Sequence, residues 1–180
     1  NVHLLGVFTI AFTVVYRKKA LYPIYTYVLL NGIFCGFATW WIPYLYLWAV
    51  LWGATMLLPK RIPEKIRPLV YMLLCAAHGF LFGTLYAPAQ ALLYGLSFQK
   101  MIAWIISGLP WDFVHGVSNF FCGILIVPIV KILTFLEKIF RKSFVFSVGE
   151  IRNYNLESET DRGENPLAAC GRMRGSYGES

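Results

Sequence analysis

Long apolar runs separated by short polar breaks organise the first 136 residues of the chain. In chain order, five such runs cover residues 2–16, 20–38, 44–58, 69–86 and 110–136. Several are shorter than the roughly 20 residues that cross a hydrocarbon core, but flanking Tyr and Trp side chains at the interfaces can make up the difference. The pattern predicts an all-α, polytopic membrane helix bundle with five spans.

The stretch 87–109 is also apolar, but Pro88, Gln90 and Gly95 interrupt it. If it were a regular span, the basic residues after position 137 would move to the outer side of the membrane, against the positive-inside rule. We therefore expect a short helix or a re-entrant segment on the outer side, where other parts of the protein cover it.

The basic residues set the expected topology. The breaks at 17–19, at 60–67 and after 137 are rich in Lys and Arg and are expected in the cytoplasm, whereas the turn at Trp40 and Trp41 is expected outside. Five spans satisfy these constraints when the first starts outside. A further span before Asn1 would complete a bundle, so we interpret the chain as five spans of an expected six, in the plasma membrane, with a cytoplasmic C-terminus.

The apolar pattern ends near Ser143, and this divides the chain into two expected parts. Residues 1–142 are predicted to form the transmembrane, substrate-binding bundle. Residues 143–180 are polar and Gly-rich at their end, so they are predicted to be a disordered cytoplasmic tail.

Composition supports an integral membrane protein. The chain is 58% hydrophobic and only 14% charged, whereas soluble domains are about 25% charged. The net charge of +7 arises within residues 1–140, where ten Lys and Arg face three Asp and Glu, mostly in the short polar breaks. No basic face of a soluble fold is visible, so a nucleic-acid partner is not expected.

Two kinds of motif are missing from the sequence. The four cysteines have no CxxC spacing, and three lie in apolar runs, so neither a zinc site nor a disulfide framework is predicted. There is no GxxxxGK[ST] phosphate loop, so the chain is not expected to hydrolyse ATP itself, and no cofactor is predicted.

The most informative polar residues are Asp112, His115 and Asn119, which share one helical face. Ionisable groups at membrane depth are costly and indicate function by default. Pro110 suits the first turn of a helix, where the dipole would stabilise the nearby Asp112 carboxylate. One interpretation is thus a helix-start residue with His115 packed against it. The other, which we favour because three polar groups share the face, is the wall of an outward-opening cavity.

Five other candidate ligand-binding residues each have a structural and a functional interpretation. His78 is either a cavity residue or a hydrogen-bonded core histidine, since a mid-membrane His needs a partner in both cases. Tyr86 and Gln90 are candidates at the outer end of the fourth run, where polar groups often join helices. Trp41 and Tyr44 belong either to an aromatic belt or to a lid of rings over a planar ligand.

The pairs Gly32/Gly36 and Gly79/Gly83 have helix spacing that lets two backbones approach closely. They indicate packing within the bundle or, as the alternative, a docking surface for a partner protein.

Catalysis and metal binding have weak support. Ser118 and His115 are three residues apart but lack a GxSxG context, so no nucleophile is predicted. Asp112 and His115 would give a metal only two ligands, with His78 as a distant third. We therefore predict no catalytic residue and no metal site.

The segment 108–120, GLPWDFVHGVSNF, resembles the start of the last helix in the substrate-binding S components of energy-coupling factor (ECF) transporters. Segments 1–6, 16–20, 41–44 and 86–90 look like one branch of that group whose substrate is unassigned. The resemblance covers about residues 1–136.

This resemblance implies a six-helix membrane protein that captures a vitamin or similar micronutrient outside the cell. It also implies partners: a membrane coupling protein (T component) and two cytoplasmic ATPases. Family members bind ligand in the outer half of the bundle, which corresponds here to the neighbourhoods 40–48, 86–90 and 112–119. The first helix of the family, which carries a small-residue docking motif, has no counterpart, and the tail differs from the family's short basic end.

On this interpretation, the polar edge of the ligand bonds to the Asp112 face and aromatic rings cover its apolar side. The expected ligand-binding residues are Asp112, His115, Asn119, Trp111, Trp41, Tyr44, Tyr86, Gln90 and His78. Two alternatives stay open. One is a small intramembrane enzyme that uses Asp112 and His115 as acid and base, and the other is a fragment of a secondary transporter.

Overall fold

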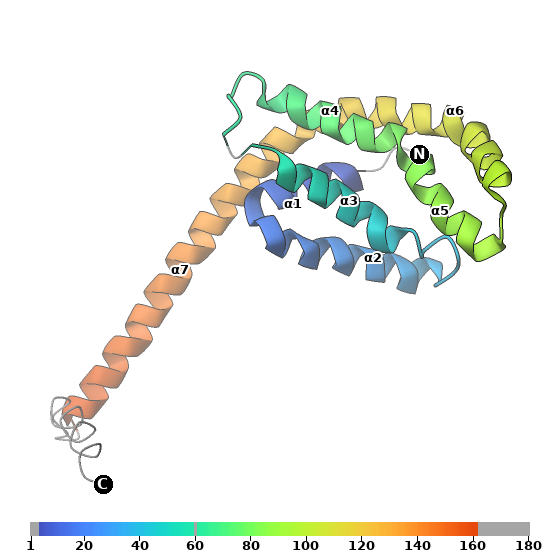
Figure 1. The fold of residues 1–180 in the computed structure, drawn as a ribbon. Helices are drawn as coiled ribbons and strands as arrows, with labels where there is room; N and C mark the ends of the chain where they lie inside the picture. Colours follow the sequence, from blue (N-terminus) through green and yellow to red (C-terminus); the bar gives the residue numbers. More distant parts are fainter. Residues whose placement is uncertain (1–3, 60, 162–180) are drawn as a thin grey trace, which may run out of the picture. The chain divides into compact units, whose positions relative to one another are not determined.

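The computed structural model describes residues 4–59 and 61–161, with side chains as far as residue 143, and all its regular elements there are helical. The elements, shown in Figure 1, are α1 (Leu5–Tyr16), η1 (Arg17–Ala20), α2 (Leu21–Cys35), α3 (Tyr44–Leu57), α4 (Arg67–Phe80), α5 (Phe82–Tyr94), α6 (Phe98–Cys122), η2 (Gly123–Leu125) and α7 (Ile126–Asp161). The two η elements are short 3-10 turns. The all-α prediction is confirmed.

The chain divides into two units, Asn1–Thr134 and Phe135–Ser180. Unit 1 contains α1 to α6 and the first residues of α7, and unit 2 contains the rest of α7. All contacts and cavities described below belong to unit 1.

The core of unit 1 is formed by apolar side chains from several helices. Its buried members are Val7, Ile10, Ala11, Ala20, Ile24, Val28, Trp48, Leu51, Tyr71, Cys75 and Ile126. In Figure 1, α4 lies alongside α6 and α1 lies next to α3, and both pairs are in contact. This packing fixes α6, the helix that carries Asp112, against α4 and α5.

The helix borders around Pro110 differ from the prediction. α5 continues through Pro88, and the left-handed Gly95 (φ 59°) follows it. α6 then begins after Ser97, whose side chain accepts a bond from the backbone N–H of Lys100 at 3.4 Å. Pro110 therefore lies inside α6, and the prediction of a helix start there is wrong. Residues 87–94 belong to α5 and residues 98–109 to α6, so this stretch is largely helical, and its re-entrant course on the outer side stays a prediction.

The beginning of the predicted disordered tail is also helical. α7 runs from Ile126 to Asp161, so the prediction of disorder is wrong for residues 143–161. No proline occurs between Pro128 and Pro166, and Gly149 is the only glycine between 143 and 161, so nothing there stops the helical hydrogen-bond pattern. The remainder of the predicted tail, 162–180, lies outside the described residues.

The surface of unit 1 exposes many large apolar side chains, among them Phe34 (81% exposed) and Leu92 (85% exposed). Soluble proteins expose single apolar side chains, but so many large ones are unusual. Within the described residues, two helical stretches, Arg67–Tyr94 and Phe98–Ser143, are long and apolar enough to cross a membrane, and Tyr44–Leu57 is apolar but shorter. These features suggest membrane association, and the five-span arrangement stays a prediction.

Candidate functional site

The carboxylate of Asp112 caps the start of α5. The backbone N–H of Gly83 donates to both carboxylate oxygens, at 2.9 Å to Oδ1 and 3.0 Å to Oδ2. Leu81 (φ −94°, ψ 0°) interrupts the regular helix between α4 and α5, and amides in the first turn of a helix need an outside acceptor. Asp112 is 4% exposed and supplies that acceptor from α6. The dipole of α5, rather than that of its own helix as predicted, stabilises this carboxylate.

The glycines on the α4–α5 side allow α6 to approach this closely. An added Cβ at Gly79 would lie 2.8 Å from the carbonyl oxygen of His115 and 2.9 Å from Cα of Gly116. At Gly83, the same atom would lie 2.5 Å from Oδ2 of Asp112. The structure thus gives the Gly79/Gly83 pair a role in packing within the bundle.

A cavity of about 270 Å³ lies between α5 and α6. Its lining residues are Phe82, Gly83 and Tyr86 from α5 and Trp104, Gly108, Trp111, Asp112 and His115 from α6. We call it the α5–α6 cavity. Four of the predicted ligand-binding residues are therefore brought together in one place: Tyr86, Trp111, Asp112 and His115.

Stacked rings form the walls of the α5–α6 cavity. The ring centroids of Tyr86 and Trp104 are 5.9 Å apart and the two rings are nearly parallel. The ring centroids of Phe82 and His115 are 5.4 Å apart. Phe82 also stacks on Tyr86, at 6.1 Å. Such walls suit a planar, mostly apolar molecule. Almost all of the cavity surface is apolar, and the carboxylate and the imidazole of its lining belong to Asp112 and His115.

Asn119 and His78 lie outside this cavity and join helices instead. The side-chain amide of Asn119 donates to the carbonyl of Cys75 at 3.4 Å, which links α6 to α4. Nε2 of His78 lies 3.1 Å from the carbonyl oxygen of Leu47, which links α4 to α3. Both side chains are buried, so these bonds give His78 the role of a core histidine.

The remaining predicted residues also lie away from the lining. Nε1 of Trp41 donates to the carbonyl of Val28 at 2.7 Å, so Trp41 fastens the turn after α2 to that helix. Tyr44 does not line the cavity, but its ring contacts that of Phe82, with the ring centroids 6.4 Å apart. Gln90 lies one turn beyond Tyr86 on α5, and their side chains interact.

Three lining residues, Trp104, Gly108 and Phe82, are not among those predicted from the sequence. Trp104, Gly108 and Trp111 have the spacing i, i+4 and i+7, and His115 follows at i+11, so one helical face carries them all. This spacing can be read from the sequence. A helix start at Pro110, however, places Trp104 and Gly108 in one segment and Trp111 and His115 in another.

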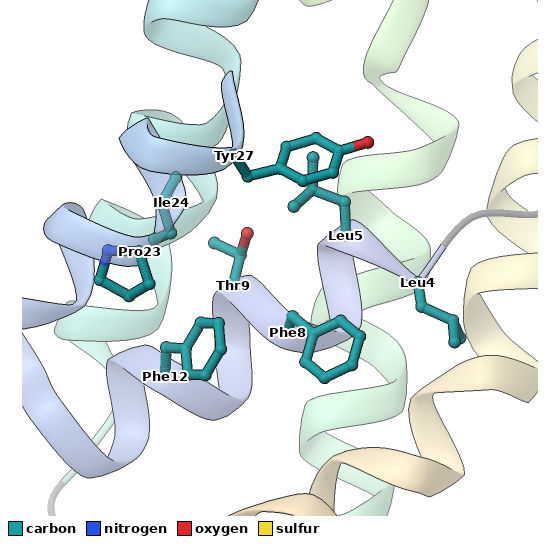
Figure 2. A pocket seen from close by; sticks show the side chains of 8 residues that line it. All are labelled: Leu4, Leu5, Phe8, Thr9, Phe12, Pro23, Ile24 and Tyr27. Carbon is teal, nitrogen blue, oxygen red and sulfur yellow. The ribbon is translucent and has the colours of Figure 1, made fainter. Parts of the chain in front are cut away.

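Other hollows in unit 1 contain less polar chemistry or none of the predicted residues. A hollow of about 340 Å³ lies between α1 and α2, where Phe8 and Phe12 from α1 and Tyr27 from α2 surround Thr9 (Figure 2). Another, of about 630 Å³, is lined by Asp112 and otherwise by apolar side chains of α4 and α6. Of these hollows within the described residues, the α5–α6 cavity is the one that combines stacked rings with both Asp112 and His115.

The described residues contain no group of three or more His, Cys, Asp or Glu side chains that could hold a metal ion. The chemistry available in the α5–α6 cavity is therefore that of one carboxylate, one imidazole and aromatic faces. In comparisons with known proteins, the chain matches no protein-family model, no curated protein and no solved structure.

Proposed function

We propose that this chain is a membrane-embedded binding protein that captures a small planar molecule, of the vitamin type, in the α5–α6 cavity. In this proposal it serves as the substrate-binding S component of an ECF-type importer. The observation that carries the proposal is the combination of stacked rings with Asp112 and His115 around one cavity. Ligand sites typically combine apolar and aromatic walls with a few placed polar groups.

The lining also restricts the ligand. A volume of about 270 Å³ favours a compact molecule, and parallel rings favour a flat one. Asp112 already accepts two bonds from Gly83 and has lone pairs left for N–H or O–H groups of a ligand. We therefore expect a heteroaromatic ring whose edge carries a donor for Asp112 and a partner for His115.

The arrangement of the helix ends supports a cavity near the outer side. The basic segments 17–19 and 61–67 flank a single cavity where α1 and α3 end and α4 begins, as expected for a cytoplasmic face. At the other end of α3, the hydroxyl of Tyr86 donates to the carbonyl of Trp40 at 3.0 Å. In this proposal the chain crosses the membrane five times, and the coupling protein and two ATPases act from the cytoplasm.

Native mass spectrometry of the gently purified protein in nanodiscs tests the proposal. We expect a retained organic molecule, recovered chemically unchanged, and uptake of that molecule into cells that depends on the coupling protein and on ATP. A protein that retains nothing except lipid and detergent contradicts ligand capture. Uptake that follows a proton or sodium gradient without an ATPase contradicts the ECF assignment.

Gly108→Leu is expected to block the α5–α6 cavity without disturbing the helix packing. Gly108 lines the cavity, and an added Cβ meets nothing within 4 Å. The leucine side chain therefore fills ligand space, and we expect a loss of affinity of at least about tenfold, which is about 1.4 kcal/mol. Gly53→Leu is the matched control, because Gly53 is also helical and open but lines none of these cavities. Equal ligand retention by the two variants, measured by the same mass spectrometry, would place the ligand elsewhere.

A further inference from the structure

A cavity of about 310 Å³ lies where α1 and α3 end and α4 begins. Arg17, Thr55 and Tyr71 supply its polar side chains, and Ile62 is among the apolar ones. We call it the Arg17 cavity. It shares no lining residue with the α5–α6 cavity, so it is a separate feature of unit 1.

Contacts from α3 hold Arg17 in an unusual backbone conformation. Its φ of 55° is the only positive value of a non-glycine residue in the described ranges. The indole N–H of Trp52 donates to the carbonyl of Arg17 at 3.1 Å, and the guanidinium of Arg17 donates to the carbonyl of Met56 at 3.4 Å. Such conformations persist where the surrounding structure determines them strongly, and they gather at ligand sites. The guanidinium is therefore held beside the cavity.

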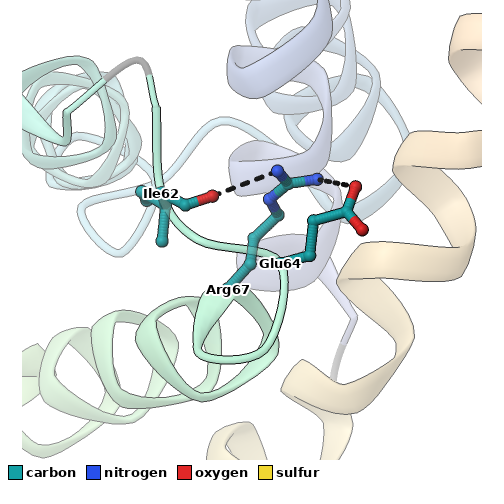
Figure 3. Close-up of polar contacts among 3 residues, drawn as sticks. All are labelled: Ile62, Glu64 and Arg67. Carbon is teal, nitrogen blue, oxygen red and sulfur yellow. Dashed lines mark hydrogen bonds and ion pairs between the residues drawn. The ribbon is translucent and has the colours of Figure 1, made fainter.

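The charge of Arg17 has no carboxylate partner within residues 4–59 and 61–143, where the structure contains one ion pair, between Arg67 and Glu64 at 4.0 Å. Arg67 also approaches this cavity, since its guanidinium donates to the carbonyl of Ile62 at 3.1 Å (Figure 3). An anion that joined this half-buried guanidinium would supply the charge partner that it lacks among these residues.

The surroundings favour an anion from the membrane surface. Segments 17–19 and 61–67 together contain six Lys and Arg residues and one acidic residue, Glu64. Basic clusters of this kind beside a membrane helix attract anionic lipid head groups. A guanidinium matches phosphate oxygens well, because its N–H groups can donate two parallel hydrogen bonds.

We propose that the Arg17 cavity binds a phosphate group, with Arg17 as the main contact and the hydroxyl of Tyr71 as a second donor. Tyr71 is buried, and within the described residues its hydroxyl has no hydrogen-bond partner. A lipid phosphodiester and free inorganic phosphate present the same oxygens, and the experiment below separates them. The inference goes beyond ligand capture and does not depend on it, because the two cavities have no residue in common.

Native mass spectrometry of the full chain in nanodiscs, with phosphatidylglycerol titrated against phosphatidylcholine, tests the proposal. We expect preferential retention of phosphatidylglycerol and a loss of affinity of about tenfold in Arg17→Gln. Lys100→Gln is the matched control: it removes the same charge from an exposed position outside the cavity and outside both basic segments, and less than about a twofold change is expected there. Equal losses in the two variants, or no preference for the anionic lipid, overturn the proposal.

Tyr71→Phe provides a second variant in case Arg17→Gln disturbs the turn after α1. It keeps the buried ring and removes only the proposed donor, so weaker retention of phosphatidylglycerol supports the site and unchanged retention counts against it. Inorganic phosphate added to the lipid-loaded protein then identifies the source. Displacement of the lipid shows that free phosphate is accepted too, whereas retention at high phosphate assigns the site to lipid.

Discussion

Alanine in place of Gly79 is expected to destabilise unit 1 by about 1–3 kcal/mol, the usual range for overpacking a close contact. The added methyl group would lie 2.8 Å from the carbonyl oxygen of His115 and 2.9 Å from Cα of Gly116. Both are backbone atoms and cannot rotate away, so α4 and α6 must move apart. That movement would also disturb the bond between Asn119 and the carbonyl of Cys75, which joins the same two helices.

Thermal unfolding of the Gly79→Ala variant in nanodiscs, followed by tryptophan fluorescence, measures this effect. Gly53→Ala is the control, because an added Cβ there meets nothing within 4 Å and helix propensity alone favours alanine by up to about 1 kcal/mol. We expect a lower midpoint for the first variant and an unchanged or higher one for the second. Similar midpoints for the two variants would show that α4 and α6 are not in close contact.

Asp112→Ala is expected to lower the free energy of unfolding by about 1–3 kcal/mol, because it leaves the buried N–H of Gly83 without an acceptor. The loss of stability should appear first at the junction of α4 and α5, where Leu81 interrupts the helix. Hydrogen exchange of the amides in the first turn of α5 is the direct measurement. Faster exchange there, together with a lower unfolding midpoint, is the expected result.

Asp112→Asn separates the structural role of this residue from its proposed ligand contact. The amide oxygen still accepts from Gly83, so stability should fall less than in Asp112→Ala, while the neutral acceptor holds a ligand donor more weakly. Full stability and normal exchange in Asp112→Ala would show that the carboxylate does not cap α5. A different outcome would favour an acid–base enzyme over capture: the unmodified protein converts a bound molecule chemically, and Asp112→Asn stops this conversion but still binds the molecule equally well.

The first three helices follow from the apolar pattern alone. α1, α2 and α3 lie within the runs 2–16, 20–38 and 44–58, because the polar breaks between these runs are also the turns. The break at Leu81 could not be predicted in this way. The acceptor that meets the amide of Gly83 there, Asp112, lies 29 residues away in the sequence, and local periodicity contains no such information.

Pro110 shows how a local rule can mislead. Proline is common at the first position of a helix, but here the helix starts earlier, at a capped position after Ser97. A helix start at Pro110 also places Trp104 in a separate segment, so the pattern does not indicate it as a lining residue. Asp112 and His115 were still identified, because an ionisable side chain in an apolar run indicates a partner whatever the helix borders are.

Asn119 illustrates a second limit of the sequence pattern. It shares a helical face with Asp112 and His115, yet it turns to the carbonyl of Cys75 rather than to the cavity. The spacing of residues along α6 shows which of them share a face. Which part of that face is covered by α4 depends on where the two helices cross. Gly79 places α4 over the Asn119 end, and α5 leaves the Asp112 end open as a cavity.

The most direct test of capture in the α5–α6 cavity is an experimental structure of the protein with its retained ligand. We expect ligand density against the rings of Phe82 and Trp104, with polar atoms of the ligand within hydrogen-bond distance of Asp112 and His115. Density in the hollow between α1 and α2, or a ligand-loaded protein whose α5–α6 cavity is empty, would contradict the proposal.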